Sequence, residues 1–200
     1  NNQKWVQKKI SSDPDYFNRL SSRHAPEILW IGCSDARVPA NQITGTAPGD
    51  VFVHRNISNM VVHTDMNMLS VLSYAVEVLN VKHIIVCGHY ECGGILAAMQ
   101  NKSFGLIDNW LRHVKDVYRN HLDELNEIKD ERLRYNRLVE LNVIQQVYNL
   151  CKTHIVQEAW TKEPFPHIHG WVYDLHDGIL KDLDVTFNSN TELSHMYKFE

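Results

Sequence analysis

The chain has 200 residues, of which 44% are hydrophobic and 22% are charged, with nine glycines and six prolines. This composition excludes a disordered or fibrous protein, and the length predicts a single domain, residues 1–200, with an adequate core. The net charge of −4 gives no electrostatic reason to expect binding to nucleic acid or to an anionic membrane. Four cysteines are too few for a disulfide framework. Together with twelve histidines, they favour a reducing compartment and a metal site.

The first 22 residues predict an N-terminal arm of two short helices. Trp5, Val6 and Ile10 can form one apolar stripe. Asp13 followed by Pro14 is typical of a helix start and leads into a second apolar segment at 16–20. Because helices this short are marginal alone in water, we expect the arm to dock on the body of the protein or on a second subunit.

No part of the sequence approaches the run of about 20 apolar residues that crosses a bilayer. The N-terminal residues also carry no recognisable targeting signal. We therefore expect a cytoplasmic protein that does not enter a membrane, and we leave open an organelle transit segment removed from the chain.

The rest of the chain alternates strand and helix patterns. Apolar runs predict strands at 28–31, 51–53, 83–87 and 168–173, of which the first and third are typical of strands buried in a parallel sheet. A turn at Asp177-Gly178 makes the last strand antiparallel. Apolar residues at helical spacing predict helices through 69–79 (capped by Thr64 or Asp65), 110–122 and 141–155, and the charged segment 123–137 is expected to be a solvated helix face or an exposed connection. This alternation predicts an α/β fold with a mostly parallel sheet, an antiparallel edge strand and flanking helices.

Candidate metal ligands follow two of these strands. Cys33 comes directly after the first strand, and His89 and Cys92 come directly after the strand at 83–87. Because sites in open α/β sheets form at the carboxyl ends of strands, these three side chains converge if the two strands are neighbours. Two thiolates and an imidazole suit a catalytic zinc with an open fourth position. On spacing alone, packing of core cysteines beside a chance His-x-x-Cys explains the pattern equally well.

A charged pair accompanies the first cysteine. An aspartate at 35 within reach of an arginine at 37 is held ionised by the positive charge, which suits a catalytic carboxylate. The competing interpretation of Asp35 and Arg37 is a structural salt bridge.

Three motifs occur in order along the chain: Cys-Ser-Asp-Ala-Arg-Val-Pro at 33–39, His-Arg-Asn at 54–56, and His-x-x-Cys-Gly-Gly at 89–94. Together they resemble the β-class carbonic anhydrases, and the similarity runs over residues 13–174. The resemblance implies one zinc ion per chain bound by Cys33, His89 and Cys92, with Asp35 and Arg37 as the catalytic dyad. It also implies a four-stranded parallel core sheet with an antiparallel extension.

The implied activity is the reversible hydration of carbon dioxide to bicarbonate and a proton by a zinc-bound hydroxide. Backbone N–H groups after Gly93 and Gly94, at a helix start, would favour a bicarbonate anion. The resemblance further implies an obligate homodimer whose N-terminal helices wrap the partner, commonly paired into a dimer of dimers.

A second group of residues concerns regulation. Trp30, Arg55 and Tyr173 resemble three residues that line a non-catalytic bicarbonate pocket in a bacterial subset of the family. In that subset, bicarbonate or low pH favours a closed state in which the equivalent of Asp35 leaves Arg37 and takes the fourth zinc position. The alternative is that the two aromatic residues are core residues and the arginine is a structural ion-pair partner.

One position departs from the family pattern. Many members have glutamine, placed to bind substrate, nine residues before the first zinc cysteine, and this chain has His24 there. A histidine can also donate or accept a hydrogen bond, and it titrates near neutral pH. Two other functions stay open: hydrolysis of carbonyl sulfide or carbon disulfide, and a zinc-dependent bicarbonate sensor of low turnover, against which the charged dyad argues.

Overall fold

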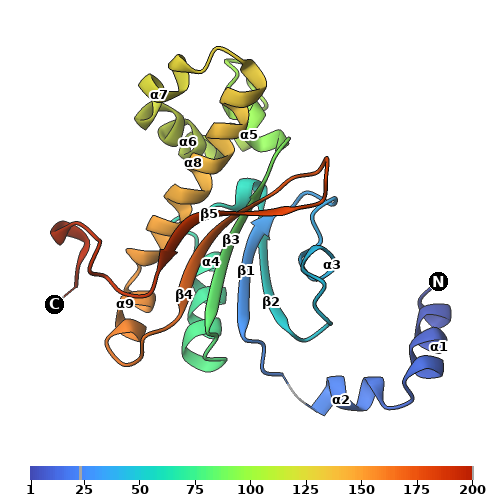
Figure 1. The fold of residues 1–200 in the computed structure, drawn as a ribbon. Coiled ribbons are helices and arrows are strands. Elements are labelled where there is room, and N and C mark those ends of the chain that lie inside the picture. Colours follow the sequence, from blue (N-terminus) through green and yellow to red (C-terminus); the bar gives the residue numbers. More distant parts are fainter. Residues whose placement is uncertain (23, 200) are drawn as a thin grey trace.

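The computed structural model describes residues 1–22 and 24–199. Its centre is a five-stranded sheet of order β2-β1-β3-β4-β5 (Figure 1). The first four strands are parallel and β5 is antiparallel to β4, which confirms the predicted sheet. The strands are β1 (Ile28–Cys33), β2 (Val51–Asn56), β3 (His83–His89), β4 (His167–Tyr173) and β5 (Leu180–Phe187).

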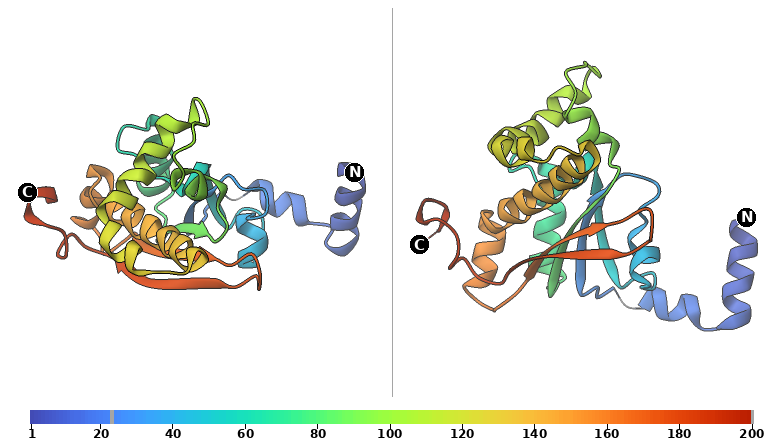
Figure 2. Two further views of the ribbon diagram at one scale, coloured as in Figure 1. Left: turned by 90° about the horizontal axis from the view of Figure 1, so that it is seen from above. Right: turned by 45° about the horizontal axis from the view of Figure 1, so that its top comes forward.

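The helices cover the two faces of the sheet unequally. The large hydrophobic core joins one face to most of the helices, which lie on that side (Figure 2). A small cluster around Trp30 joins the other face to α3. The helices are α1 (Asn2–Ser12), α2 (Tyr16–Ser22), α3 (Ala40–Thr44), α4 (Met66–Ser73), α5 (Gly93–Ala98), α6 (Ile107–Asn120), α7 (Leu122–Glu127), α8 (Glu131–Cys151) and α9 (His154–Trp160), with short turns η1 (Ile57–Asn59), η2 (Tyr74–Val78) and η3 (His195–Tyr197). Within the described ranges, no helix combines the length and the apolar character needed to cross a bilayer.

The longest helix lies directly against the two strands at the centre of the core. α8 packs on β3 and β4, where two strand residues are glycines, Gly88 and Gly170. A Cβ atom at Gly88 would lie 2.6 Å from a methyl group of Val143, and one at Gly170 would lie 3.2 Å from the other methyl group. The absence of side chains at these positions therefore lets α8 approach the sheet closely.

Helix boundaries follow the local capping chemistry. Asp65 caps α4, as predicted, by accepting hydrogen bonds from the N–H groups of Asn67 and Met68. The single helix predicted over 141–155 is wrong, because the chain breaks after Cys151 and the Thr153 side chain caps α9. The helix predicted over 110–122 likewise ends at Asn120, so its last position belongs to α7.

Two further expectations need correction. α2 begins at Tyr16 and not at the proline that follows Asp13. The carboxylate of Asp13 accepts a hydrogen bond from the backbone N–H of Asp15, in a turn that precedes the helix. The charged segment 123–137 is mostly exposed, as predicted, but it contributes Leu125 and Tyr135 to the core.

The N-terminal arm extends away from the body of the chain (Figure 1). α1 and α2 contain no buried residue. They contact each other through Trp5, whose ring meets those of Tyr16 and Phe17 edge-on with centroids 6.4 and 5.7 Å apart. Leu20 approaches the body at Gly49. The docking of this arm on a second subunit stays a prediction.

Candidate metal centre

The candidate zinc ligands come from neighbouring strand ends. Cys33 is the last residue of β1 and His89 is the last residue of β3, and the two strands pair in parallel. A turn through Glu91, which has a left-handed φ of 58°, then places Cys92 at the start of α5. The carboxyl edge of the sheet therefore brings together the three side chains that the sequence places far apart.

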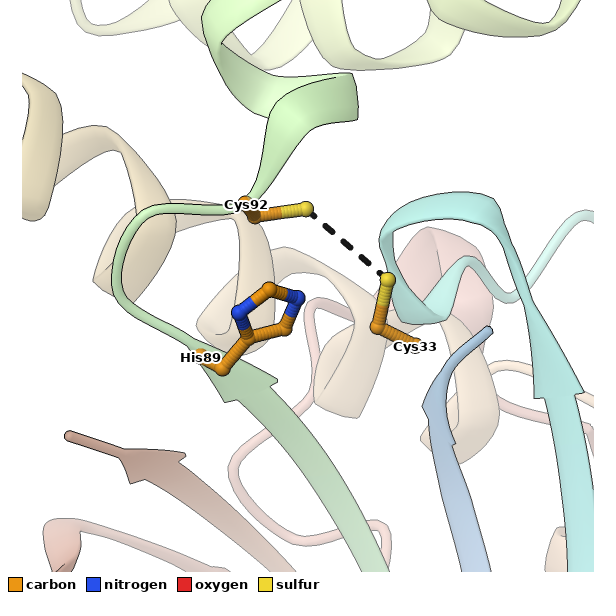
Figure 3. Close-up of side chains that lie close together, drawn as sticks. All are labelled: Cys33, His89 and Cys92. Carbon is orange, nitrogen blue, oxygen red and sulfur yellow. Dashed lines mark hydrogen bonds between the residues drawn. The ribbon is translucent and has the colours of Figure 1, made fainter. Parts of the chain in front are cut away.

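Their ligand atoms form one compact, buried group (Figure 3). The two sulfur atoms and an imidazole nitrogen all lie within 4.8 Å of one another. The Sγ atoms of Cys33 and Cys92 are 3.9 Å apart. Two thiolates on a tetrahedral zinc ion would be about 3.8 Å apart, since each Zn–S bond is about 2.3 Å. The sulfur spacing therefore fits zinc without rearrangement.

The imidazole of His89 is oriented as a ligand. Its Nδ1 lies 2.8 Å from the carbonyl oxygen of Tyr90, and because a carbonyl only accepts, Nδ1 carries the hydrogen. In the neutral ring, Nε2 then presents its lone pair to the sulfur atoms. This nitrogen is fully buried and has no hydrogen-bond partner among the described residues. A buried acceptor without a partner costs free energy, and a metal ion at this point would remove that cost.

The two thiols titrate as a pair. The hydrogen bond between the two sulfur atoms lowers the pKa of Cys33, while the same hydrogen bond, burial and the nearby charge of Cys33 raise the pKa of Cys92. The first proton is therefore easy to remove and the second is difficult. A divalent cation overcomes this repulsion, so metal uptake must release protons.

Asp35 and Arg37 form the expected ion pair beside this group. The Nε and Nη2 atoms of the arginine donate to the two carboxylate oxygens at 2.9 and 2.7 Å, and the backbone N–H of Arg37 donates to Oδ1 at 2.9 Å. These hydrogen bonds hold the pKa of Asp35 well below its usual range. The other carboxylate oxygen, Oδ2, lies 3.8 Å from Nε2 of His89, so an ionised carboxylate borders the metal position.

Comparison with known proteins assigns this arrangement to a family. A model of the carbonic anhydrase family matches residues 28–180. The chain belongs to the β-class carbonic anhydrases. It is therefore an enzyme of the carbonate dehydratase type, and the family predicted from the three motifs is confirmed.

Individual relatives cover nearly the whole chain. A carbonic anhydrase of Emericella nidulans is 52% identical over 93% of this chain and 82% of its own length. A solved structure from a study of two tetrameric β-carbonic anhydrases of Sordaria macrospora is 42% identical, with a TM-score of 0.89 over 93% of this chain and 94% of its own. The Coccomyxa β-carbonic anhydrase in complex with acetazolamide is 37% identical, with a TM-score of 0.89 over 94% of this chain and 85% of its own.

Two further residues support the candidate metal centre of this carbonic anhydrase, and the sequence predictions named neither of them. Ser58, in a left-handed turn after β2, places its hydroxyl 3.6 Å from the sulfur of Cys92. The Tyr135 hydroxyl, from α8, donates to the Cys92 carbonyl at 2.7 Å. For Ser58, the sequence offered only its place in the His-Arg-Asn-Ile-Ser segment at a strand end, which does not by itself predict the left-handed turn that brings it to Cys92. For Tyr135, 43 residues from the cysteine it supports, the sequence offered no signal.

The two glycines after Cys92 differ in their surroundings. A Cβ atom at Gly94 would lie 2.3 Å from the Ser58 hydroxyl oxygen, so the absence of a side chain there lets Ser58 pack directly against the Gly94 backbone. A Cβ atom at Gly93 would meet nothing within 4 Å. The binding of bicarbonate by N–H groups in this turn stays a prediction for both glycines.

The residues predicted for the bicarbonate pocket are placed as follows. Trp30 is buried over Gly32, and Tyr173 packs against the same small cluster on that face of the sheet. Arg55 donates through Nε to the Cys33 carbonyl at 2.7 Å and through Nη2 to the carbonyl of Asp35. The pocket itself stays a prediction.

His24 lies at the other end of the sheet from the metal centre of its own chain. Its ring contacts Phe52, near the start of β2, with the centroids 6.0 Å apart. The ligand cysteine Cys33 and histidine His89 stand at the opposite, carboxyl ends of their strands. A role for His24 in substrate binding therefore stays a prediction, and it would require the site of a second subunit.

Proposed function

We propose that the chain catalyses the reversible hydration of carbon dioxide to bicarbonate and a proton, with one zinc ion held by Cys33, His89 and Cys92. The observation that carries the proposal is the buried Nε2 of His89, which faces two thiols at the spacing of zinc ligands. When bound, zinc supplies a Lewis acid that lowers the pKa of a water molecule toward neutrality. Two thiolate ligands cancel the formal charge of the ion, so we expect this acidification to be weaker than with three neutral imidazoles, and activity to rise with pH.

Asp35 has the position and charge to orient the attacking oxygen. Arg37 keeps the carboxylate ionised, and Oδ2 faces the same point as Nε2 of His89. An ionised carboxylate there would accept a hydrogen bond from the attacking oxygen and fix the direction of its lone pair. The same ion pair disfavours protonation of Asp35, so we do not assign it the role of proton store.

We also propose inhibition by bicarbonate and low pH. The carboxylate of Asp35 is near enough to the metal position to become a fourth ligand if it leaves Arg37. Bicarbonate held near Trp30, Arg55 and Tyr173 would have to weaken that ion pair to favour the closed state. A pH–rate profile with and without added bicarbonate tests this, and a profile that bicarbonate leaves unchanged, without a steep loss of activity at low pH, argues against it.

The functional unit that we propose is a homodimer, with two dimers forming a tetramer. Large apolar side chains of the arm are exposed in the single chain, Trp5 to 43% and Leu20 to 37%. Burial of such side chains against a second copy would supply the stability that two short helices lack. The Sordaria macrospora relatives are described as tetrameric, which supports this proposal.

Stopped-flow hydration of carbon dioxide across pH, on protein of measured zinc content, tests the main proposal. We expect one zinc ion per chain and alkaline-favoured turnover, with both lost in Cys33→Ser. Stoichiometric zinc without hydration at alkaline pH would contradict the proposal. The same samples should be assayed with carbonyl sulfide and carbon disulfide, because turnover of either that is faster than carbon dioxide hydration would identify a hydrolase. Bicarbonate binding without turnover of any of these substrates would identify a sensor.

A further inference from the structure

A second group of imidazoles lies at the amino ends of the central strands, opposite the zinc centre. His83 is the first residue of β3, and His167 and His169 are the first and third residues of β4. In the parallel register, His83 pairs directly with His167, and Ile85 pairs with His169. Because side chains alternate along a strand, the three imidazoles project from the same face of the sheet.

Two of these rings bring nitrogen atoms together. Nδ1 of His83 lies 3.1 Å from Nε2 of His169. Two histidine nitrogens on a tetrahedral zinc ion are about 3.4 Å apart, since each Zn–N bond is about 2.0–2.1 Å. In the metal-free chain one of these nitrogens donates a hydrogen bond to the other, and once a metal ion replaces that hydrogen the spacing of the pair is close to that of two ligands of one ion.

The ring of His169 is held in this orientation from its other side. Its Nδ1 lies 3.1 Å from the hydroxyl oxygen of Thr186 on β5. A hydrogen bond from Nδ1–H to that hydroxyl leaves the lone pair of Nε2 directed at His83. Metal-binding histidines are commonly fixed in this way, with the second ring nitrogen bonded to a neighbouring polar group.

The third ring lies within reach of the pair. The ring of His167 stacks on that of His83, with centroids 5.5 Å apart and planes at 27°. In the structure as it stands, His167 does not yet bring a nitrogen to the other two, since among the described residues the ligand atoms that converge are those of Cys33, His89 and Cys92. Binding would require a change in the side-chain torsions of His167. All three ligands then come from two hydrogen-bonded strands, which is a rigid base for a site.

The imidazoles of the pair are disposed to stay neutral, which is the form that binds metals. Partial desolvation lowers the pKa of His83, which is exposed, and of the half-buried His169, and the neighbouring imidazoles lower it further. Two nearby carboxylates, Glu27 and Asp182, act in the opposite direction without reversing the shift. The rings therefore compete little for protons near neutral pH.

We propose that His83, His169 and His167 form a second metal site, selective for a divalent ion of the zinc, nickel or copper type. Imidazole nitrogen suits these ions, whereas magnesium and calcium prefer oxygen ligands. The site is independent of the proposed catalytic centre, because it shares no residue with that centre and lies at the other end of the sheet.

The proposal is tested by titrating Ni²⁺ into the zinc-loaded enzyme at pH 7.5, followed by calorimetry. We expect one Ni²⁺ per chain in the wild type, and affinity at least tenfold lower in each of His83→Gln, His167→Gln and His169→Gln. His195→Gln, at an exposed position far along the chain, should bind as the wild type does. Elemental analysis after dialysis should show that the catalytic zinc stays in place in every sample.

Three results would overturn the assignment. The first is the absence of an additional Ni²⁺ equivalent in the wild type, and the second is binding that His83→Gln and His169→Gln leave unchanged. The third is wild-type affinity for Ni²⁺ in His167→Gln, which would show that His167 is not a ligand. The thermal unfolding midpoint of each variant, measured without Ni²⁺, shows whether lost binding reflects a lost fold, and carbon dioxide hydration should be unaffected by all four substitutions.

Discussion

The Oδ2 atom of Asp35 lies 3.8 Å from the Nε2 atom of His89. A carboxylate at that distance can act in two ways toward a metal ion bound by the histidine. It can accept a hydrogen bond from the molecule at the fourth position, or it can take that position itself. In the mechanism that we propose, Arg37 would decide between them, since it hydrogen-bonds both carboxylate oxygens.

Replacing the carboxylate separates its orienting role from metal binding. We expect Asp35→Asn to lower kcat/KM for carbon dioxide hydration by about 100-fold or more, because the amide is neutral and binds the attacking oxygen in a different orientation. The zinc content should stay at one per chain, since all three proposed ligands remain. Stopped-flow assays and elemental analysis measure the two quantities. Asp116→Asn, on the exposed surface of α6, is the matched control, and wild-type turnover in Asp35→Asn would refute the orienting role.

The adjacent glycines offer a paired test of the turn that holds Cys92. We expect Gly94→Ala to lower the free energy of unfolding by about 1–3 kcal/mol, because its Cβ atom would overlap the Ser58 hydroxyl and a methyl group of Ile57. Displacement of Ser58 should also weaken zinc binding by about tenfold or more, since that hydroxyl contacts the Cys92 sulfur. Chemical denaturation and competition with a zinc chelator measure these effects. Gly93→Ala is the control, and equal losses in both variants would contradict the steric explanation.

The sequence predicted the parts of this centre that depend on strand ends. Cys33 and His89 could be placed together because a buried apolar run precedes each, and parallel strands end at one edge of the sheet. Asp35 and Arg37 are only two residues apart, so their pairing was a local inference. Each of these patterns is weak alone, and they identified the family only because they occur together, in one order along the chain.

The supporting residues could not be predicted in the same way. Ser58 reaches Cys92 because its backbone adopts a left-handed conformation, with φ of 64°. This conformation is uncommon for serine, so the sequence does not predict it. Tyr135 reaches the same residue from α8, and no local pattern records a contact between elements so far apart. The break before Thr153 was missed for a related reason, because the apolar spacing continues across it and only the capping hydroxyl marks the new helix.

The exposed apolar residues of the arm predict an assembly defect when they are removed. We expect the combined change of Trp5, Ile10 and Leu20 to serine to shift the protein to smaller species in sedimentation velocity, because these side chains are proposed to be buried against a second copy. Leu106→Ser with Met196→Ser is the control, since these residues are more exposed, at 89% and 77%, but lie on the body of the chain. An unchanged sedimentation coefficient in the arm variant would contradict the proposed role of the arm.

A pH-dependent contribution to stability is expected from Glu140, on α8. Its side chain is 13% exposed and accepts hydrogen bonds from the Tyr90 hydroxyl at 2.6 Å, Lys181 Nζ at 2.7 Å and Arg137 Nη1 at 3.0 Å. Burial alone would raise the pKa of this carboxyl group, but the hydrogen bonds outweigh burial and hold the pKa below its usual value. A carboxyl group with a lowered pKa in the folded state stabilises the fold fully above its unfolded pKa of about 4.3, and this stabilisation is lost as the pH falls through the folded value.

We therefore expect Glu140→Gln to lower the free energy of unfolding by about 1–3 kcal/mol at pH 7, because it leaves two cations without their shared carboxylate. The difference from the wild type should begin to shrink below about pH 4.3, where the carboxyl group of the unfolded chain takes up a proton, and it should be lost as the pH falls through the lower pKa of the folded state. Urea denaturation at several pH values measures both effects. Glu158→Gln is the control, because its ion pair with Lys162 is exposed and screened by solvent and should contribute little to stability. A difference for Glu140→Gln that is the same at pH 7 and at pH 3.5 would show that its charge is not the source of the stabilisation.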